Sequence, residues 1–263
     1  MWFLLGFIHT ETVARPGWGE RIRCAVQKGY GTEALERPLF GRPALFVRHR
    51  NLNERNPIGE MLLERGVDKV LFSEASGVSD VPLRRMDRSY LYTYLAGDVG
   101  AHVAERSGAT AVCFFRTLGQ LEERALLKLA GVFRYLMISV QRDSGAICRD
   151  LRRRYGLPVV EDPTPNQVKG ADFALVLHPP GRDVVFSGRC LLFEPNREMR
   201  ATEGGRACMG TPITGLDLDV PPDLAAEIPA GFRPLPILSE AAFRGQIDPA
   251  RIKIHGVSLD KSM

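Results

Sequence analysis

The sequence predicts an α/β fold, with a mostly parallel sheet, helices on both faces and a C-terminal extension. Its 263 residues are 44% hydrophobic and 25% charged, which is ordinary for a globular domain. Four times in succession an amphipathic stretch ends at a glycine and a short β-rich run follows, at Gly66, Gly108, Gly131 and Gly156. Glycine lacks a Cβ and suits the left-handed residue that ends many helices. Helix, turn and strand repeated in this order are typical of parallel sheets.

The expected strands are short and continuously apolar, as strands covered on both faces usually are. They lie at residues 2–8, 44–47, 68–73, 110–115, 134–140, 157–160 and 172–177. Residues 184–186 and 190–193 flank a Ser-Gly-Arg turn and are interpreted as a hairpin at the sheet edge. The stretch 83–107 is predicted to be helical, either continuous or broken near Gly97 or Gly100.

The domain organisation follows from a change in composition near residue 196. Residues 1–195 are interpreted as one α/β domain. Residues 196–263 are rich in glycine and proline at first but keep apolar residues, so we expect an ordered extension packed on that domain. It ends in a helix from Ser239 and a strand at 251–257.

The cysteines and the N-terminus predict a cytoplasmic protein. The five cysteines are odd in number and widely spaced, and no Cys-x-x-Cys occurs, so neither a disulfide framework nor a zinc site is indicated. The first basic residue is Arg15, and the features of a signal peptide are missing. No apolar run approaches the roughly 20 residues that a membrane helix needs.

Polar residues at the strand ends are the candidates for chemistry, because open α/β sheets bind ligands beyond the carboxyl ends of their strands. The candidate catalytic residues at these positions are His9, His49, Glu74 and His178. In an enzyme we expect one of these histidines within hydrogen-bond reach of Glu74, Asp143 or Glu161. No residues have the spacing of metal ligands, so no metal is predicted.

The loop at residues 141–145 is the predicted ligand-binding element. It joins a buried strand to a helix N-terminus, whose free N–H groups favour an anion. Ser144 and Gly145 would donate N–H groups, and Arg142 would grip a phosphate or carboxylate. Asp143 opposes an anion there, and would instead cap the helix or hold Arg142 in a salt link. Residues 134–156 contain six Arg and two Asp, so their balance of 6 − 2 = +4 equals that of the whole chain.

Residues 134–178 resemble part of a Rossmann domain, so the predicted sheet is Rossmann-like. Glu161 ends a strand about 20 residues after the loop, where dinucleotide-binding folds place a ribose-binding carboxylate. Lys169–Leu177 reads as a small residue, an Asp and an apolar run, as before a later strand of such domains. The Gly-x-Gly-x-x-Gly fingerprint is missing and Gly145 is the only glycine of the loop. The cofactor therefore stays unassigned, and a plain structural strand–helix–strand unit is the alternative.

The leading hypothesis is a protein that binds an anionic small molecule, a nucleotide or a phosphorylated metabolite, at the carboxyl edge of the strands. The sequence leaves open whether it is an enzyme, and it does not indicate an oligomeric state. The alternative is a non-catalytic regulatory or scaffold protein that keeps the fold without a cofactor. Nucleic acid is not an expected partner, because no basic strand with interleaved aromatic residues occurs.

Overall fold

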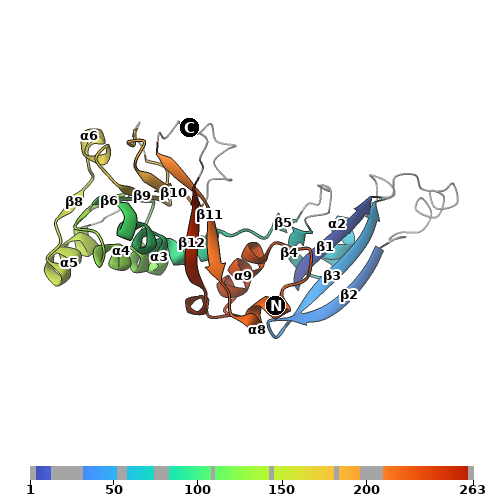
Figure 1. Cartoon of the computed structure of the whole chain (residues 1–263). Coiled ribbons are helices and arrows are strands. Elements are labelled where there is room, and N and C mark those ends of the chain that lie inside the picture. The colour runs from blue at the N-terminus through green and yellow to red at the C-terminus, as the bar shows by residue number, and fades with distance from the viewer. Residues whose placement is uncertain are drawn as a thin grey trace. The chain divides into compact units, whose positions relative to one another are not determined.

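The chain is divided into two compact units. The computed structural model describes residues 4–12, 32–51, 58–73, 83–107, 110–141, 145–180, 184–195 and 210–259. Unit 1 consists of Met1–Arg88 and Pro221–Asp248, and unit 2 consists of Ser89–Val220 and Pro249–Met263 (Figure 1). This division differs from the expected domains 1–195 and 196–263, because the C-terminal quarter of the chain contributes to both units.

Unit 1 is built on a five-stranded sheet in the order β2-β3-β1-β4-β5. Its strands are β1 (Leu4–Thr12), β2 (Thr32–Leu39), β3 (Arg42–Asn51), β4 (Val67–Phe72) and β5 (Arg84–Arg85). β1 runs parallel to β3 and β4, and β2 runs antiparallel to β3. The β2–β3 turn has positive φ at Phe40 (47°) and Gly41 (72°), as a type I′ hairpin requires.

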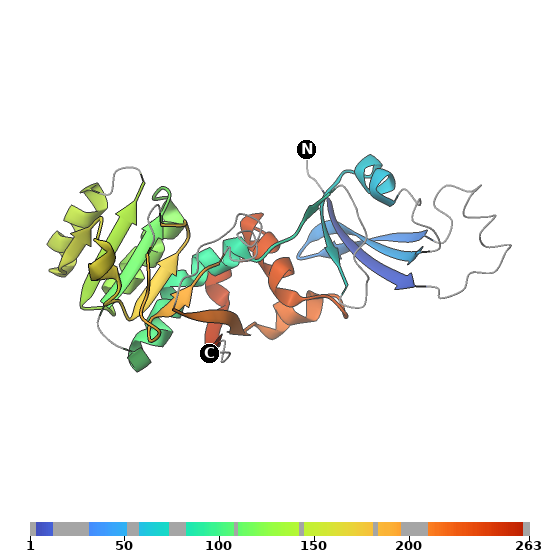
Figure 2. The ribbon, with the colours of Figure 1, turned by 90° about the horizontal axis from the view of Figure 1, so that it is seen from above.

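The two faces of the unit 1 sheet are covered differently. One face is covered by α2 (Ile58–Glu64), the short helix beside this sheet in Figure 2. Its Ile58 and Leu62 pack against Ile8, Leu45 and neighbouring aliphatic residues. On the other face Phe7 stacks on Phe46, with the ring centroids 4.9 Å apart. Phe232 meets the Phe7 ring edge-on at 5.4 Å. Phe232 lies between α8 (Pro222–Glu227) and α9 (Pro234–Phe243).

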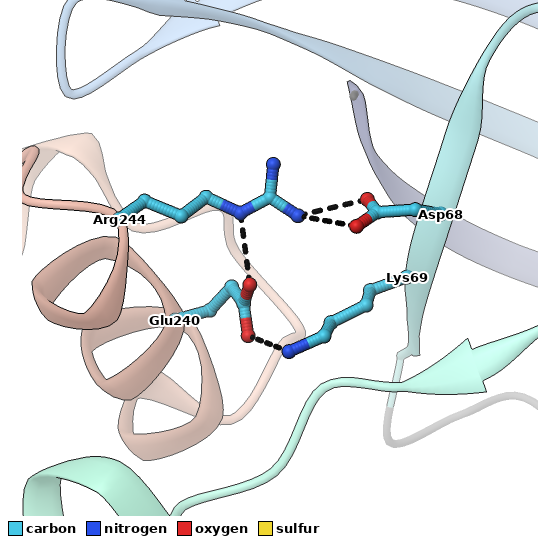
Figure 3. Close-up of polar contacts among 4 residues, drawn as sticks. All are labelled: Asp68, Lys69, Glu240 and Arg244. Atoms are coloured by element: carbon cyan, nitrogen blue, oxygen red, sulfur yellow. Dashed lines mark hydrogen bonds and ion pairs between the residues drawn. The ribbon is translucent and has the colours of Figure 1, made fainter. Parts of the chain in front are cut away.

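A network of four charged residues joins α9 to β4 (Figure 3). Arg244 donates to Glu240 Oε1 at 2.8 Å and to both oxygens of Asp68, and Lys69 donates to Glu240 Oε2 at 2.7 Å. Burial by itself lowers the pKa of Arg244, but the hydrogen bonds and charges of Glu240 and Asp68 outweigh it and raise that pKa above its ordinary value. Glu240 is only 4% exposed, so its charge needs both of its cationic partners.

Unit 2 contains a seven-stranded sheet in the order β12-β11-β10-β9-β6-β7-β8. Its strands are β6 (Thr110–Phe115), β7 (Tyr135–Val140), β8 (Val159–Glu161), β9 (Phe173–Val176), β10 (Leu191–Phe193), β11 (Thr211–Asp219) and β12 (Lys253–Leu259). The first six run parallel, which confirms the prediction for the strands at 110–115, 134–140, 157–160 and 172–177. Numbered along the chain, these six follow the spatial order 3-2-1-4-5-6 of the doubly wound Rossmann fold.

Helices cover one face of this sheet. α3 (Ser89–Ser107), α4 (Gln120–Ala130) and α5 (Gly145–Tyr155) lie side by side (Figure 1). α3 is a single helix, so the possible break near Gly97 or Gly100 is absent. A Cβ on Gly97 would lie 2.7 Å from Lys128 Cβ and 3.1 Å from Ala125 Cα, so this glycine permits the close approach of α3 to α4.

The opposite face of the unit 2 sheet is covered by α6 (Pro165–Val168) and by the chain that follows β9. Val168 and Phe186 pack against Val112, Phe114 and Ala174. The expected hairpin of 184–186 with 190–193 is wrong, since residues 184–187 form no strand and β10 pairs in parallel with β9 and β11. Phe186 is buried as a cover for the sheet, which explains why this run is apolar although it is not a strand.

The last two strands of the chain complete this sheet, while Pro221–Asp248 between them belongs to unit 1, so the residues after 196 do not form one extension. β11 pairs in parallel with β10, and β12 pairs antiparallel with β11. The final strand was expected at 251–257 and lies at Lys253–Leu259. The helix expected from Ser239 begins earlier, at Pro234.

The glycines expected at helix ends behave in two ways. Gly66 and Gly156 have positive φ, 76° and 60°, as predicted. Gly131 has φ −77° in the right-handed region, and its N–H donates to the Lys128 and Leu129 carbonyls, so the prediction is wrong for this residue. Gly108 lies outside the described residues.

Candidate functional site

The carboxyl edge of the unit 2 sheet brings together polar residues from three neighbouring strands. Arg116 follows β6, Gln141 follows β7 and His178 follows β9, and β6 lies between the other two strands. Gln141 Nε2 lies 2.7 Å from His178 Nε2, so the two side chains bond across the end of β6.

Backbone hydrogen bonds fix both of these residues to β6. The N–H groups of Leu177 and His178 donate to the Phe114 carbonyl at 3.1 Å, and the Gln141 N–H donates to the Phe115 carbonyl at 3.3 Å. His178 is half-buried, while Arg116 and Gln141 are exposed. The edge therefore offers one imidazole in a fixed orientation beside an exposed guanidinium.

The other predicted catalytic residues belong to the sheet of unit 1. His9 lies on β1, and its Nδ1 is 2.8 Å from Ser73 Oγ. His49 lies on β3, but its side chain is outside the described residues, as is Glu74. The expectation that all these strand ends belong to a single sheet is wrong, because β1, β3 and β4 pair with one another and none of them pairs with β6, β7 or β9.

His9 lines a pocket within unit 1. The pocket has a volume of about 320 Å³ and an aromatic wall formed by Phe7, Phe46 and Phe232. Its charged lining residues are Glu33, Arg37 and Arg48.

The strand order changes the place of the loop 141–145 in the fold. Arg142, Asp143 and Ser144 lie outside the described residues, and Gly145 begins α5. In the Rossmann order the phosphate-binding turn follows the first strand and the ribose-binding residue ends the second. The first strand is β6, so the phosphate position falls at residues 116–119, and the loop after β7 falls at the ribose position. The sequence resemblance had assigned the phosphate-binding turn to the loop after β7 and the ribose-binding residue to Glu161, each one strand too late.

Glu161 consequently ends the third strand of this order, and it already has a partner. Arg152 of α5 forms an ion pair with the Glu161 carboxylate at 2.9 Å and donates to the Val159 carbonyl at 2.9 Å. Arg154 pairs with Asp150 at 2.9 Å. Part of the basic excess of residues 134–156 is thus neutralised within α5 and β8.

The N-termini of α4 and α5 differ in charge. The Gly119 N–H donates to Glu122 Oε2 at 3.1 Å, and Glu123 also lies in the first turn of α4. The first turn of α5 contains no acidic residue. Since a carboxylate already lies at the α4 N-terminus, a further anion is disfavoured there. The sequence signal for this was Gly119 followed three residues later by Glu122, the spacing of a capping box.

These features define the class of unit 2, a Rossmann-type α/β domain with six parallel strands and a polar carboxyl edge. No family model matches the chain, and no curated protein matches it.

Among the described residues, no helix combines the length and apolar character needed to cross a membrane.

Solved structures with a similar arrangement include three at low sequence identity. A dipicolinate synthase subunit from Bacillus halodurans is 12% identical, with 93% of this chain and 98% of that chain covered and a TM-score of 0.38. The iminosuccinate reductase of Paracoccus denitrificans is 15% identical, with 62% and 51% covered and a TM-score of 0.30. A probable ornithine cyclodeaminase from Bordetella pertussis is 16% identical, with 59% and 40% covered and a TM-score of 0.29. The chain thus spans 51% and 40% of the last two proteins, and these distant likenesses assign no activity to it.

Proposed function

We propose that unit 2 binds an anionic small molecule, a nucleotide or a phosphorylated metabolite, at the carboxyl edge of its parallel strands. The observation that carries this proposal is the order β9-β6-β7, which puts Arg116, Gln141 and His178 at one edge. Ligands of open α/β sheets bind outside this edge, where the strand order reverses. That reversal lies between β6 and β9, beside His178.

The anion would bind at the loop before α5. The sequence places Arg142, Asp143 and Ser144 immediately before Gly145, the first residue of α5. The positive end of the helix dipole favours a negative group there by roughly 0.3–1 kcal/mol, and the Arg142 guanidinium would add a full charge. Glu161 is assigned a supporting role, since its pair with Arg152 connects α5 to β8.

His178 is the candidate catalytic group of this edge, because the hydrogen bond with Gln141 orients its ring. An imidazole can serve as a general base or, when protonated, as a general acid near pH 7. His9, His49 and Glu74 belong to the other sheet and are not assigned to this edge. A cytoplasmic location is part of the proposal, and it rests on the odd number and wide spacing of the five cysteines in the sequence.

Calorimetric titration tests the proposal directly. Phosphate, ATP, NAD and NADP are titrated into the wild type and into Arg142→Ala and Arg116→Ala. We expect at least one nucleotide to bind, with about tenfold lower affinity in Arg142→Ala because a charge-assisted contact is lost. Arg134→Ala is the matched control, since this exposed arginine precedes β7 at the opposite end of the strand. The proposal fails if no anion binds at millimolar concentration, or if Arg142→Ala binds as tightly as the wild type.

One observation favours the alternative, a regulatory or scaffold protein without a cofactor. Glu122 caps the helix that follows the first strand, where a dinucleotide would place its pyrophosphate. Under this alternative the wild type and Glu122→Gln both fail to bind nucleotides. Binding that appears only in Glu122→Gln would instead show that the fold accepts a nucleotide once this carboxylate is neutral.

A further inference from the structure

A cavity of unit 2 lies between α3, α4 and the start of β12. Its volume of about 730 Å³ is within the usual range of ligand sites, about 300–1,000 Å³. Tyr94, Asp98 and His102 line it from α3, and Arg124 and Lys128 line it from α4. Lys253 of β12 completes its polar lining. The carboxyl-edge site is formed by different elements, the ends of β6, β7 and β9.

Two buried nitrogen atoms of this lining have no hydrogen-bond partner in the described part of the chain, His102 Nε2 and Arg124 Nε. Nearly all buried polar groups of folded proteins are hydrogen-bonded. The Arg124 Nε–H is an obligatory donor, and the imidazole nitrogen becomes a donor when it carries the ring proton. Both atoms are therefore left without the hydrogen bond that a buried polar atom usually makes, and both belong to side chains that line the cavity.

The charges around the cavity select an anion. Lys128 forms an ion pair with Asp98, and the lining as a whole has three cations, Arg124, Lys128 and Lys253, against one carboxylate. The balance is 3 − 1 = +2 without counting His102. The Arg124 guanidinium lies 4.1 Å from the centroid of the Tyr94 ring, and this contact holds it in place. A positively charged concave surface concentrates anions.

The remaining lining is apolar and indicates that the anion has an organic body. Val132, Ile252 and Ile254 belong to the cavity wall, and Val132 is 42% exposed. A bare inorganic ion would leave Val132 and the accessible part of Ile254 in contact with water. A molecule with an apolar body and one acidic group covers both parts of the lining.

We propose that this cavity binds a small organic anion, whose carboxylate or phosphate group lies beside Arg124 and His102. Lys128 and Lys253 add attraction without a defined contact to the ligand, and Val132, Ile252 and Ile254 pack against its body. This site is separate from the nucleotide or metabolite site proposed at the carboxyl edge.

The experiment uses the full chain and simple probes. Benzoate and phenyl phosphate carry an apolar ring and an acidic group, benzamide and benzyl alcohol are their neutral counterparts, and inorganic phosphate lacks the ring. Affinities come from calorimetry, and the Arg124 Nε–H signal, assigned with Arg124→Gln, is followed by nitrogen-15 NMR. We expect one equivalent of benzoate or phenyl phosphate to bind and to shift this signal. The tighter of the two identifies the acidic group, and inorganic phosphate and the neutral compounds should bind more weakly.

Variants on separate elements keep the test decisive. Arg124→Gln is expected to weaken binding about tenfold because a charge-assisted hydrogen bond is lost. Lys253→Gln, at an exposed position of β12, should weaken it less and reduce its dependence on salt. Arg134→Gln, exposed before β7, should bind like the wild type. Arg142→Ala should also leave this affinity unchanged, which separates this site from the carboxyl edge.

Three results would overturn the proposal. If neither organic anion binds at millimolar concentration, the cavity holds only water. Equal affinity for benzamide and benzoate would show that the charge of the ligand is irrelevant. Unchanged affinity in both Arg124→Gln and Lys253→Gln would place the ligand elsewhere.

Discussion

Arg244, the residue that follows α9, donates through one terminal nitrogen to both carboxylate oxygens of Asp68 on β4, at 2.8 and 2.9 Å. The guanidinium also contacts Glu240, which is 4% exposed and is held from its other side by Lys69. The four groups thus form a chain of opposite charges between a helix from the end of the sequence and a strand from its beginning (Figure 3).

Arg244→Met is predicted to destabilise unit 1 by about 2–3 kcal/mol, because removal of one partner leaves Glu240 and Asp68 incompletely paired. Urea unfolding measures this loss. Arg154→Met is the control, since Arg154 is 62% exposed in its pair with Asp150 and such pairs contribute within about 1 kcal/mol. Equal losses in both variants would contradict a special role for the Asp68–Arg244–Glu240–Lys69 network.

Gly97→Ala is predicted to destabilise unit 2 by about 1–3 kcal/mol. The added methyl group would lie 3.1 Å from the Ala125 backbone, which cannot move aside as a flexible side chain does. This cost outweighs the gain of about 1 kcal/mol in helix propensity. Thermal unfolding is compared with that of Gly188→Ala, where a Cβ meets open space. A variant at position 97 that is more stable than the wild type would show that α3 and α4 separate easily.

Gly156→Ala is predicted to cost about 1 kcal/mol, because φ is 60° there and a Cβ is disfavoured in the left-handed region. Gly131→Ala is the matched control at a neighbouring helix end. Its φ of −77° suits alanine, so this substitution should be neutral or slightly stabilising. Chemical denaturation of the two variants measures the difference, and an equal effect at both sites would contradict the conformational explanation.

Cys113 is predicted to make stability fall at alkaline pH. Burial raises the pKa of its thiol far above the ordinary value of 9.0. The folded protein keeps this proton while the unfolded chain releases it, so the contribution is fully present below the unfolded pKa and is lost as pH rises above it. The loss is about 1.4 kcal/mol per pH unit.

Urea unfolding of the wild type and Cys113→Ala at pH 8, 9 and 10 isolates this effect, because other groups titrate equally in both proteins. Cys113→Ala is less stable at pH 8 owing to the cavity that it creates. The gap between the two proteins should narrow from pH 9 to 10. A gap that stays constant would show that the thiol ionises within the folded protein.

The sequence by itself determined the local elements of this protein. The apolar runs at 110–115 and 134–140 became β6 and β7, and Gly156 ends α5 in the left-handed conformation as expected. These features depend on side-chain periodicity and on the conformational freedom of glycine, which act over a few neighbouring residues. The parallel direction of β6, β7, β8 and β9 was predictable from the connections between them, because a helix-sized connection joins parallel strands.

Only the tertiary structure decided which strands are neighbours. The sequence contains no local signal that separates β1 from β6, so His9 and His178 were expected at one edge although they belong to two sheets. The pairing of β6 with both β7 and β9 also makes β7 the second strand of the Rossmann order. The loop at residues 141–145 therefore lies at the ribose position, and Glu161 ends the third strand. Strand pairing, for example that of β10 with β11, is stabilised by many contacts between residues far apart in the sequence. No single residue therefore determines which strands are neighbours.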